Sequence, residues 1–294
     1  MTLATSSDNS SRVRLRELVH AAGAALLFAA LYLLVLAALL GAGMMESMAG
    51  AQWGALLAVV FATIVAGRFL DGRLPDAGLR VPFPRALFSI ASGTAIAAAA
   101  VGAGHALILL SSGLSLEWGP GLAARDTILV VLPAAVHEEL LFRGWAFQKL
   151  ARWSATLTVL GGAVLFGVLH GGNPAVGWLG LVNIMAAGVM LSLAFLAFRN
   201  LWAPIALHYA WNVLSGPVLG YEVSGWRPSA TLYSQSDPGP AFLTGGDFGI
   251  EGSIWMVLVQ LPIIIALTLR IADRSRRERS DTIRASLMEG KESS

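Results

Sequence analysis

Two adjacent carboxylates inside an apolar segment are the first residues in this sequence that could do chemistry. They lie in the stretch Ala-Val-His137-Glu138-Glu139-Leu-Leu-Phe-Arg143-Gly-Trp. On a helix, Glu139 and Arg143 are one turn apart and can form an ion pair. Glu138 lies about 100° around the helix from Glu139 and has a poorer partner in Arg143. We therefore expect Arg143 to anchor Glu139, and Glu138 to remain available as a general base or acid.

Two further segments carry polar pairs at helical spacing. Phe166-Gly-Val-Leu-His170 and His208-Tyr-Ala-Trp-Asn212 each place two residues four positions apart, on one helix face. Histidine and asparagine can together present N–H donors to a developing oxyanion. Taken alone, His170 has a second interpretation as a hydrogen-bonded packing residue. The His208–Asn212 pair is equally well explained, on its own, as a polar clamp between helices.

A metal site is another interpretation of the same residues. His137-Glu138 opens like the zinc motif H-E-x-x-H, but Leu141 stands where the second histidine belongs, so that motif fails. Glu138, His170 and His208 could still bind one divalent metal such as zinc, because two histidines and a glutamate form a known zinc set. The chain has no cysteine, which excludes a thiol nucleophile and Cys-type zinc sites. Metal-dependent and metal-free chemistry both remain open.

The composition indicates that lipid surrounds much of the chain. Of the 294 residues, 56% are hydrophobic and 13% charged, and the mean hydropathy is +0.68. Soluble domains carry about 25% charged residues. A charged group near the centre of a bilayer costs about 2.5–3.5 kcal/mol, so the ionisable residues above must face the inside of a helix bundle. The sequence therefore predicts an all-α, polytopic transmembrane bundle, and it contains no motif for nucleic-acid binding.

Eight apolar segments are candidates for membrane spans of about 20 residues. The first, second, third, sixth and eighth are clear, whereas the fourth, fifth and seventh contain the ionisable residues. The apolar run that follows the basic N-terminal residues is too long for a signal peptide, so we expect a retained first helix. The eight candidates are residues 20–45, 51–70, 86–113, 124–147, 155–170, 175–198, 201–220 and 252–272.

The distribution of charge supports eight spans with both termini cytoplasmic. Cytoplasmic segments of membrane proteins are enriched in Lys and Arg, and with this topology they hold 17 of the 20 basic residues. These are Arg12, Arg14, Arg16, Arg68, Arg73, Arg80, Arg85, Lys149, Arg152, Arg199, Arg270, Arg274, Arg276, Arg277, Arg279, Arg284 and Lys291. The opposite segments carry Glu46, Glu117, Asp126, Glu222, Asp237, Asp247 and Glu251.

These features predict three regions. Residues 1–19 form a cytoplasmic N-terminal segment, and residues 20–272 form the transmembrane domain. Residues 273–294 form a charged cytoplasmic tail, which we expect to be disordered beyond its first turns. The longest loop covers residues 221–251, which are rich in Gly, Ser, Pro and Thr. The expected location is the plasma (inner) membrane of a prokaryote, as a multi-pass integral protein.

The three polar segments together resemble the CPBP family, also called the Abi or CAAX-protease-and-bacteriocin-processing family. Its type II CAAX prenyl endoprotease members are intramembrane enzymes. The resemblance covers roughly residues 125–220, with a looser likeness at 243–249. It rests on three motifs in the family's order: Glu138-Glu139-x-x-x-Arg143, Phe166-x-x-x-His170 and His208-x-x-x-Asn212.

The resemblance implies a role for each residue. Glu138 and His170 would activate the attacking water, and the neighbouring Glu–Arg pair would orient that base. His208 and Asn212 would stabilise the oxyanion of the tetrahedral intermediate. The family is often labelled as metalloproteases, yet the same residues support a glutamate-type mechanism without metal.

The expected function is therefore an intramembrane endopeptidase acting on a membrane-associated peptide or protein. The family name suggests prenylated CAAX peptides, although nothing in the sequence identifies a groove for a prenyl chain. One alternative is a catalytically silent immunity or scaffold protein of the same fold. Another is a proton-coupled transporter that uses Glu138 and Glu139 as a relay. A transporter predicts an inverted repeat with broken helices, and the sequence shows no such symmetry.

Overall fold

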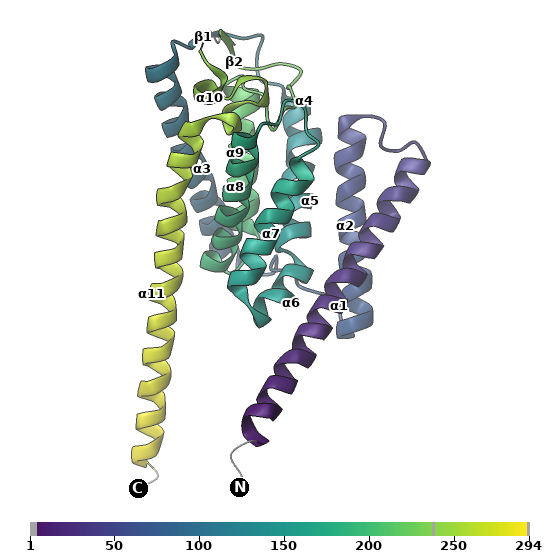
Figure 1. The fold of residues 1–294 in the computed structure, drawn as a ribbon, viewed down its shortest axis with the longest axis vertical. Helices are drawn as coiled ribbons and strands as arrows, with labels where there is room; N and C mark the ends of the chain where they lie inside the picture. The colour runs from purple at the N-terminus through teal and green to yellow at the C-terminus, as the bar shows by residue number, and fades with distance from the viewer. Residues whose placement is uncertain (1–4, 237–238, 293–294) are drawn as a thin grey trace.

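The computed structural model describes residues 5–236 and 239–292, and these form a bundle of helices (Figure 1). A short antiparallel sheet and several single turns cap one end of the bundle. The all-α class predicted from the sequence is confirmed. In chain order the elements are α1 (Thr5–Gly41), α2 (Met48–Asp71), α3 (Phe83–Ser112), β1 (Ser115–Trp118), α4 (Ala124–Asp126), the π-helical turn η1 (Thr127–Val131), α5 (Leu132–Arg143), α6 (Trp145–Trp153), α7 (Ala155–His170), α8 (Trp178–Phe198), α9 (Trp202–Val213), the π-helical turn η2 (Leu214–Val218), β2 (Tyr233–Ser236), α10 (Ala241–Thr244), the 3₁₀ turns η3 (Gly246–Phe248) and η4 (Ile250–Gly252), and α11 (Ile254–Glu292).

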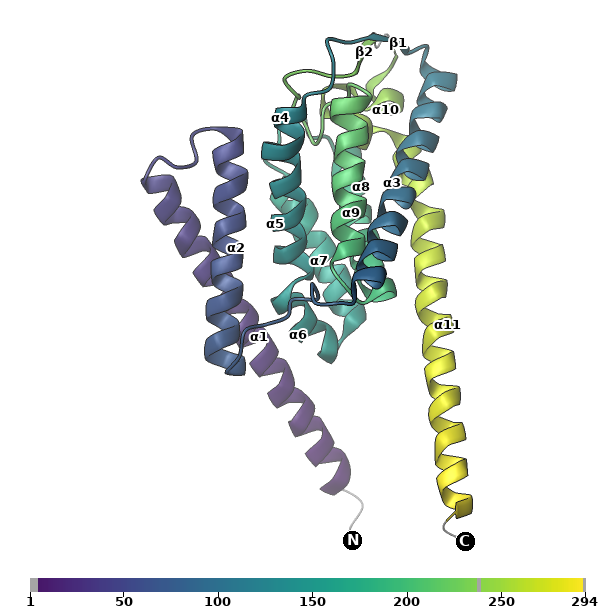
Figure 2. The same cartoon turned by 180° about the vertical axis from the view of Figure 1, so that it is seen from behind.

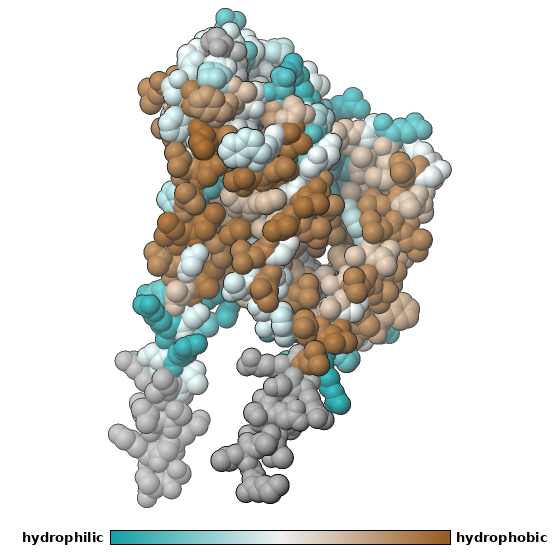
Figure 3. Space-filling model, viewed as in Figure 1, coloured by the Kyte–Doolittle hydropathy of each residue, from teal (hydrophilic) through white to brown (hydrophobic). Residues whose placement is uncertain are grey.

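Five of the described helices are long and apolar enough to cross a membrane, which makes this a multi-pass integral membrane protein. They coincide with the five clear candidates of the sequence. On the face drawn in Figure 3, apolar residues cover the middle of the bundle and hydrophilic residues lie toward its two ends. The other three predicted spans correspond to α4–η1–α5, α7 and α9–η2, so a total of eight remains a prediction. The five segments are Leu15–Gly41, Met48–Asp71, Phe83–Ser112, Trp178–Phe198 and Ile254–Thr282.

The start of α1 and the end of α11 lie at the same end of the bundle (Figures 1 and 2). We call this end the terminal face; it includes the connections at 72–82, 144–154 and 199–201. The opposite end, the distal face, includes the connections at 42–47, 113–123, 171–177 and 219–253. The basic residues that predict a cytoplasmic side therefore gather at the terminal face. Asp237 lies outside the described residues, and the cytoplasmic orientation itself remains a prediction.

Two segments differ from their predicted form. The span expected over 124–147 ends at Arg143, because Gly144 leaves the helical conformation with φ −75° and ψ −145° and α6 begins as a separate helix. A Cβ at this glycine would lie 2.1 Å from the Leu140 carbonyl oxygen, so only glycine fits this break. The charged tail is also helical as far as Glu292, whereas disorder was expected there. The Asp273–Arg277 ion pair, one turn apart, helps to explain this continuation.

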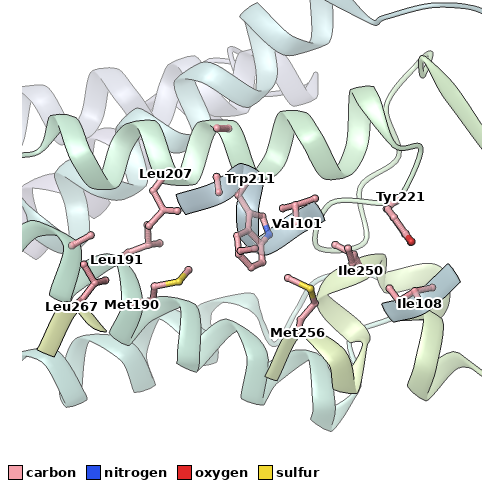
Figure 4. Packing of buried hydrophobic residues seen from close by; sticks show 14 of the residues in the cluster. Val101, Ile108, Met190, Leu191, Leu207, Trp211, Tyr221, Ile250, Met256 and Leu267 are labelled. Carbon is pink, nitrogen blue, oxygen red and sulfur yellow. The ribbon is translucent and has the colours of Figure 1, made fainter. Parts of the chain in front are cut away.

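Two clusters of buried apolar side chains hold the bundle together. The first joins α3, α8, α9 and α11 and includes Val101, Met190, Leu207 and Met256 (Figure 4). The second joins α1, α2, α5, α6, α7, α8 and α9 near the terminal face, and its members include Phe28, Val59, Trp145, Phe147, Phe195 and Leu201. We call this second group the terminal apolar cluster. Together the two clusters fix the mutual positions of the helices that carry the polar residues.

The close packing of α3 on α9 predicts the effect of a single methyl group. A Cβ at Gly93 would lie 2.3 Å from the Ala203 carbonyl oxygen, so Gly93→Ala should destabilise the protein by about 1–3 kcal/mol. Gly102 is the matched control on the same helix, because a Cβ there meets nothing within 4 Å. Gly102→Ala should leave stability unchanged or raise it by up to about 1 kcal/mol. Thermal unfolding in detergent, followed by circular dichroism, compares the two; equal effects would contradict this packing.

Candidate active site

Three helices bring one carboxylate and two imidazoles together. Glu138 lies on α5, His170 ends α7, and His208 lies in the middle of α9. Glu138 Oε2 is 3.9 Å from His170 Nε2 and 3.8 Å from His208 Nε2. Both distances exceed a direct hydrogen bond, yet they keep the three groups electrostatically coupled. The structure thus brings together three residues that lie on three separate helices in the sequence.

Glu139 and Arg143 form a buried ion pair behind this group. Their side chains are 0% and 1% exposed, and Arg143 Nη1 donates to Glu139 Oε1 at 3.1 Å. The remaining guanidinium nitrogens bind α8: Nη2 donates to the Gly188 carbonyl at 2.8 Å and Nε to Ser192 Oγ at 3.2 Å. The pair expected from the sequence is present, and α8 supplies the partners that a buried guanidinium requires.

Gly188 and Ser192 are two site residues that the sequence analysis missed. A Cβ at Gly188 would lie 2.9 Å from Ala163 Cα, so this glycine lets α7 pack directly against α8. Its carbonyl oxygen accepts hydrogen bonds from both Arg143 and Ser192 Oγ. The spacing Gly-x-x-x-Ser in an apolar helix was the available signal, because small residues in membrane helices mark close helix contacts.

The two histidines differ in what their Nδ1 atoms bind. His170 Nδ1 is 2.7 Å from the Phe166 carbonyl oxygen, which can only accept, so Nδ1 carries a proton and the lone pair of the neutral ring is on Nε2. His208 Nδ1 is 2.9 Å from Glu139 Oε1. A carboxylate partner stabilises the charged imidazolium, whose Nε2 is then a donor. Near Glu138, one imidazole is therefore suited to accept a proton and the other to donate one.

Phe166 packs against both of these rings. Its ring centroid is 4.5 Å from that of His170 and 6.4 Å from that of His208. Phe142 packs edge-on against it, and the Arg143 guanidinium carbon lies 5.1 Å from its centroid. The sequence analysis placed Phe166 on the face of His170 without a role. In the structure it forms an apolar wall that fixes both imidazoles.

One cavity of about 670 Å³ reaches four of the six candidate residues. Glu138, His170, His208 and Asn212 line it, whereas Glu139 and Arg143 do not. The six therefore divide into four that a substrate can meet and a buried pair that supports them. His105 of α3 lies outside the cavity, where its Nδ1 is 2.9 Å from Tyr221 Oη.

Asn212 lies one turn after His208 and is 8% exposed. Next to it, Trp211 Nε1 donates to Glu251 Oε1 at 3.2 Å, and the Ser224 backbone N–H donates to Glu251 Oε2 at 2.9 Å. This carboxylate therefore ties the distal loop to α9, at the edge of the cavity that it also lines. Glu251 had no assigned role in the sequence analysis, because nothing in its neighbourhood along the chain connects it with α9.

The metal interpretation gains no support from the geometry. The described residues contain no group of three or more His, Cys, Asp or Glu side chains arranged to bind a metal ion. Glu138, His170 and His208 line one cavity, but their side chains are not arranged as a metal-binding group in this structure.

The fold and the site define a polytopic membrane protein with a buried glutamate–histidine cluster beside a cavity. Residues 120–214 match the family model described as type II CAAX prenyl endopeptidase Rce1-like. This segment is therefore similar to the Rce1-like family, part of CPBP, as the motifs predicted. It contains all six candidate residues. No curated protein and no solved structure matches the chain.

The buried pair makes a prediction about stability. Arg143→Gln removes the guanidinium partner of Glu139 and leaves this buried carboxylate with His208 alone, and breaking a buried ion pair costs about 3–5 kcal/mol. The double variant Glu139→Gln/Arg143→Gln removes that charge and should recover most of the loss. Chemical unfolding in detergent gives the four free energies of the double-mutant cycle. Additive effects of the two substitutions would contradict a direct ion pair.

Proposed function

We propose that this protein is an intramembrane endopeptidase that hydrolyses a peptide bond in a membrane-associated peptide or protein. The observation that carries the proposal is the position of Glu138 Oε2 between the Nε2 atoms of His170 and His208, on the wall of a cavity. The family match over residues 120–214 supports the same class of activity.

Glu138 and His170 are suited to activate the attacking water. A water bound between the carboxylate and the lone pair of His170 Nε2 gives up a proton as its oxygen attacks the scissile carbonyl carbon. The same proton then passes to the leaving nitrogen as the C–N bond breaks, giving one carboxylic acid and one amine. The imidazole of His170 is held in place, because its Nδ1 is bound to a helix carbonyl.

His208 and Asn212 are suited to stabilise the oxyanion. In the charged form favoured by Glu139, His208 can donate through Nε2, and the Asn212 amide adds N–H donors one turn away. Donors already in place need no reorganisation when negative charge develops on the carbonyl oxygen. Glu139 acts here as a positioning residue, since it holds His208 and is itself held by Arg143.

The cavity favours a substrate that is itself associated with the membrane. Its wall contains apolar side chains from α1, α2, α5, α7 and α8, including Leu36, Met48, Leu141 and Ile184. Prenylated CAAX peptides, which the description of the family names, are therefore suitable first probes. A catalytically silent scaffold would bind such a peptide without cleaving it. Turnover therefore distinguishes a peptidase from a scaffold.

Glu138→Gln should abolish turnover while preserving the fold. The substitution keeps the shape of the side chain and removes the base, which contributes typically 10²–10⁴-fold. The assay follows cleavage of a fluorogenic prenylated CAAX peptide, and of a membrane-peptide library, by protein in detergent. Glu46→Gln on the distal connection is the control for charge. We expect EDTA to leave wild-type turnover intact; turnover by Glu138→Gln close to that of wild type would contradict the assignment.

Asn212 should act on the rate and not on substrate binding. Asn212→Asp keeps the size of the side chain but removes its N–H donors, and loss of an oxyanion donor costs about 10²–10³ in kcat. We expect kcat to fall with KM nearly unchanged, and Asn212→Ala to behave in the same way. Steady-state kinetics on the probe cleaved by wild type measures both. A rise in KM at unchanged kcat would instead assign Asn212 to ground-state binding.

A further inference from the structure

The cavity reaches from the catalytic group to the distal face, and no residue of the terminal-face connections lines it. We propose that the protein takes its substrate from that side of the membrane, and that this is the non-cytoplasmic side. The proposal rests on the proposed peptidase function and specifies its substrate class. The substrates are segments of membrane or exported proteins that reach the non-cytoplasmic half of the bilayer.

The residues around the cavity show its direction. From α1 the wall takes Tyr32 and Leu36, close to the distal end of that helix, and from α2 it takes Met48 and Gln52, in the first turns. Residues 223–227 of the distal loop complete the wall. Among these, Arg227 is 76% exposed at the mouth of the cavity, where it pairs with Glu222. Every contribution from α1, α2 and the loops thus lies toward the distal face (Figures 1 and 2).

Toward the terminal face the cavity is closed by two buried layers. The first is the ion pair of Glu139 and Arg143 with Ser192, all 1% exposed or less. The second is the terminal apolar cluster, in which Trp145 and Leu201 are 5% and 0% exposed. No residue of either layer lines the cavity. A peptide on the terminal side therefore meets packed protein and not the catalytic group.

The charges assign these two faces to the two sides of the membrane. The terminal face collects the basic residues, which stay cytoplasmic in membrane proteins. The distal face carries acidic residues, among them Glu46, Glu117 and Asp126. The open side of the cavity is therefore the non-cytoplasmic side.

The rim of the cavity defines the chemistry of its occupant. Leu33, Met48 and Leu169 line the cavity and are also 61%, 45% and 58% exposed, so in a bilayer they meet acyl chains. Arg227 and the distal loop lie at the aqueous end of the same cavity. This combination fits a juxtamembrane peptide with one part in lipid and one in water. A lipidated C-terminus on the cytoplasmic side would face the closed layers.

The absence of cysteine allows a direct test in the full-length protein. Single cysteines are introduced at the mouth (Arg227→Cys), inside the cavity (Ala134→Cys) and on α11 beyond the terminal face (Arg276→Cys). Arg227→Cys and Arg276→Cys are matched, because each removes the same charge. Intact cells are treated with a membrane-impermeant maleimide, before and after permeabilisation. Ala66→Cys, at a position that is 0% exposed, reports labelling of unfolded protein.

We expect the cysteines at 227 and 134 to be labelled in intact cells. The cysteine at 276 should be labelled only after the membrane is permeabilised. Labelling at 276 but not at 227 in intact cells would overturn the assignment of sides. If position 134, like position 276, is labelled only after permeabilisation, the proposed direction of the cavity is wrong. These readouts do not require turnover. Cleavage is tested separately, with probes added on either side of sealed proteoliposomes. If the labelling pattern is as expected but no probe is cleaved, the peptidase function is rejected and the access route still holds.

Discussion

A buried charge in a membrane-spanning helix is the constraint on which this structure depends. Arg143 cannot lose its charge under ordinary conditions, and a charged group inside a bilayer is stable only when it is paired and fully hydrogen-bonded. Glu139 supplies the countercharge, while Gly188 and Ser192 accept hydrogen bonds from Nη2 and Nε. Because these partners lie on α5 and α8, the ion pair fixes the relative height and rotation of the two helices. The glycine also brings α7 against α8.

The chemistry grows out of the same ion pair. Glu139 Oε1 accepts from Arg143 and from His208 at once, so one oxygen atom connects the framework to the reactive groups. It turns His208 Nε2 toward Glu138, and the approach of α7 puts His170 on the other side of the same carboxylate. His170 can therefore act as a base and His208 as a hydrogen-bond donor beside the same carboxylate, Glu138. Their Nδ1 atoms bind partners of different charge: a neutral backbone carbonyl for His170 and a carboxylate for His208. The difference between the two histidines comes from their surroundings, not from their sequence.

Much of the site could be predicted because it is local. Glu139 with Arg143, Phe166 with His170, and His208 with Asn212 are pairs one helical turn apart, and that spacing is visible in any helix. The contributions of Gly188, Ser192 and Glu251 depend on contacts between helices and loops, for which the sequence offers no comparable spacing. The break at Gly144 was missed because the apolar pattern continues across it. The helical tail was missed because its charged composition suggested disorder, although its i,i+4 ion pairs favour a helix.

The closed layers also bear on the transporter alternative. A relay through Glu138 and Glu139 needs a polar path to both faces of the membrane, or two states that open to each face in turn. Glu138 meets the cavity, but Glu139 is 0% exposed, bound by Arg143 and His208, and followed by the terminal apolar cluster. Opening a path there would unpair a buried arginine from its carboxylate and expose large apolar side chains. A hydrolase needs water on only one side of its catalytic group, and a cavity closed on the other side meets that need without such a rearrangement.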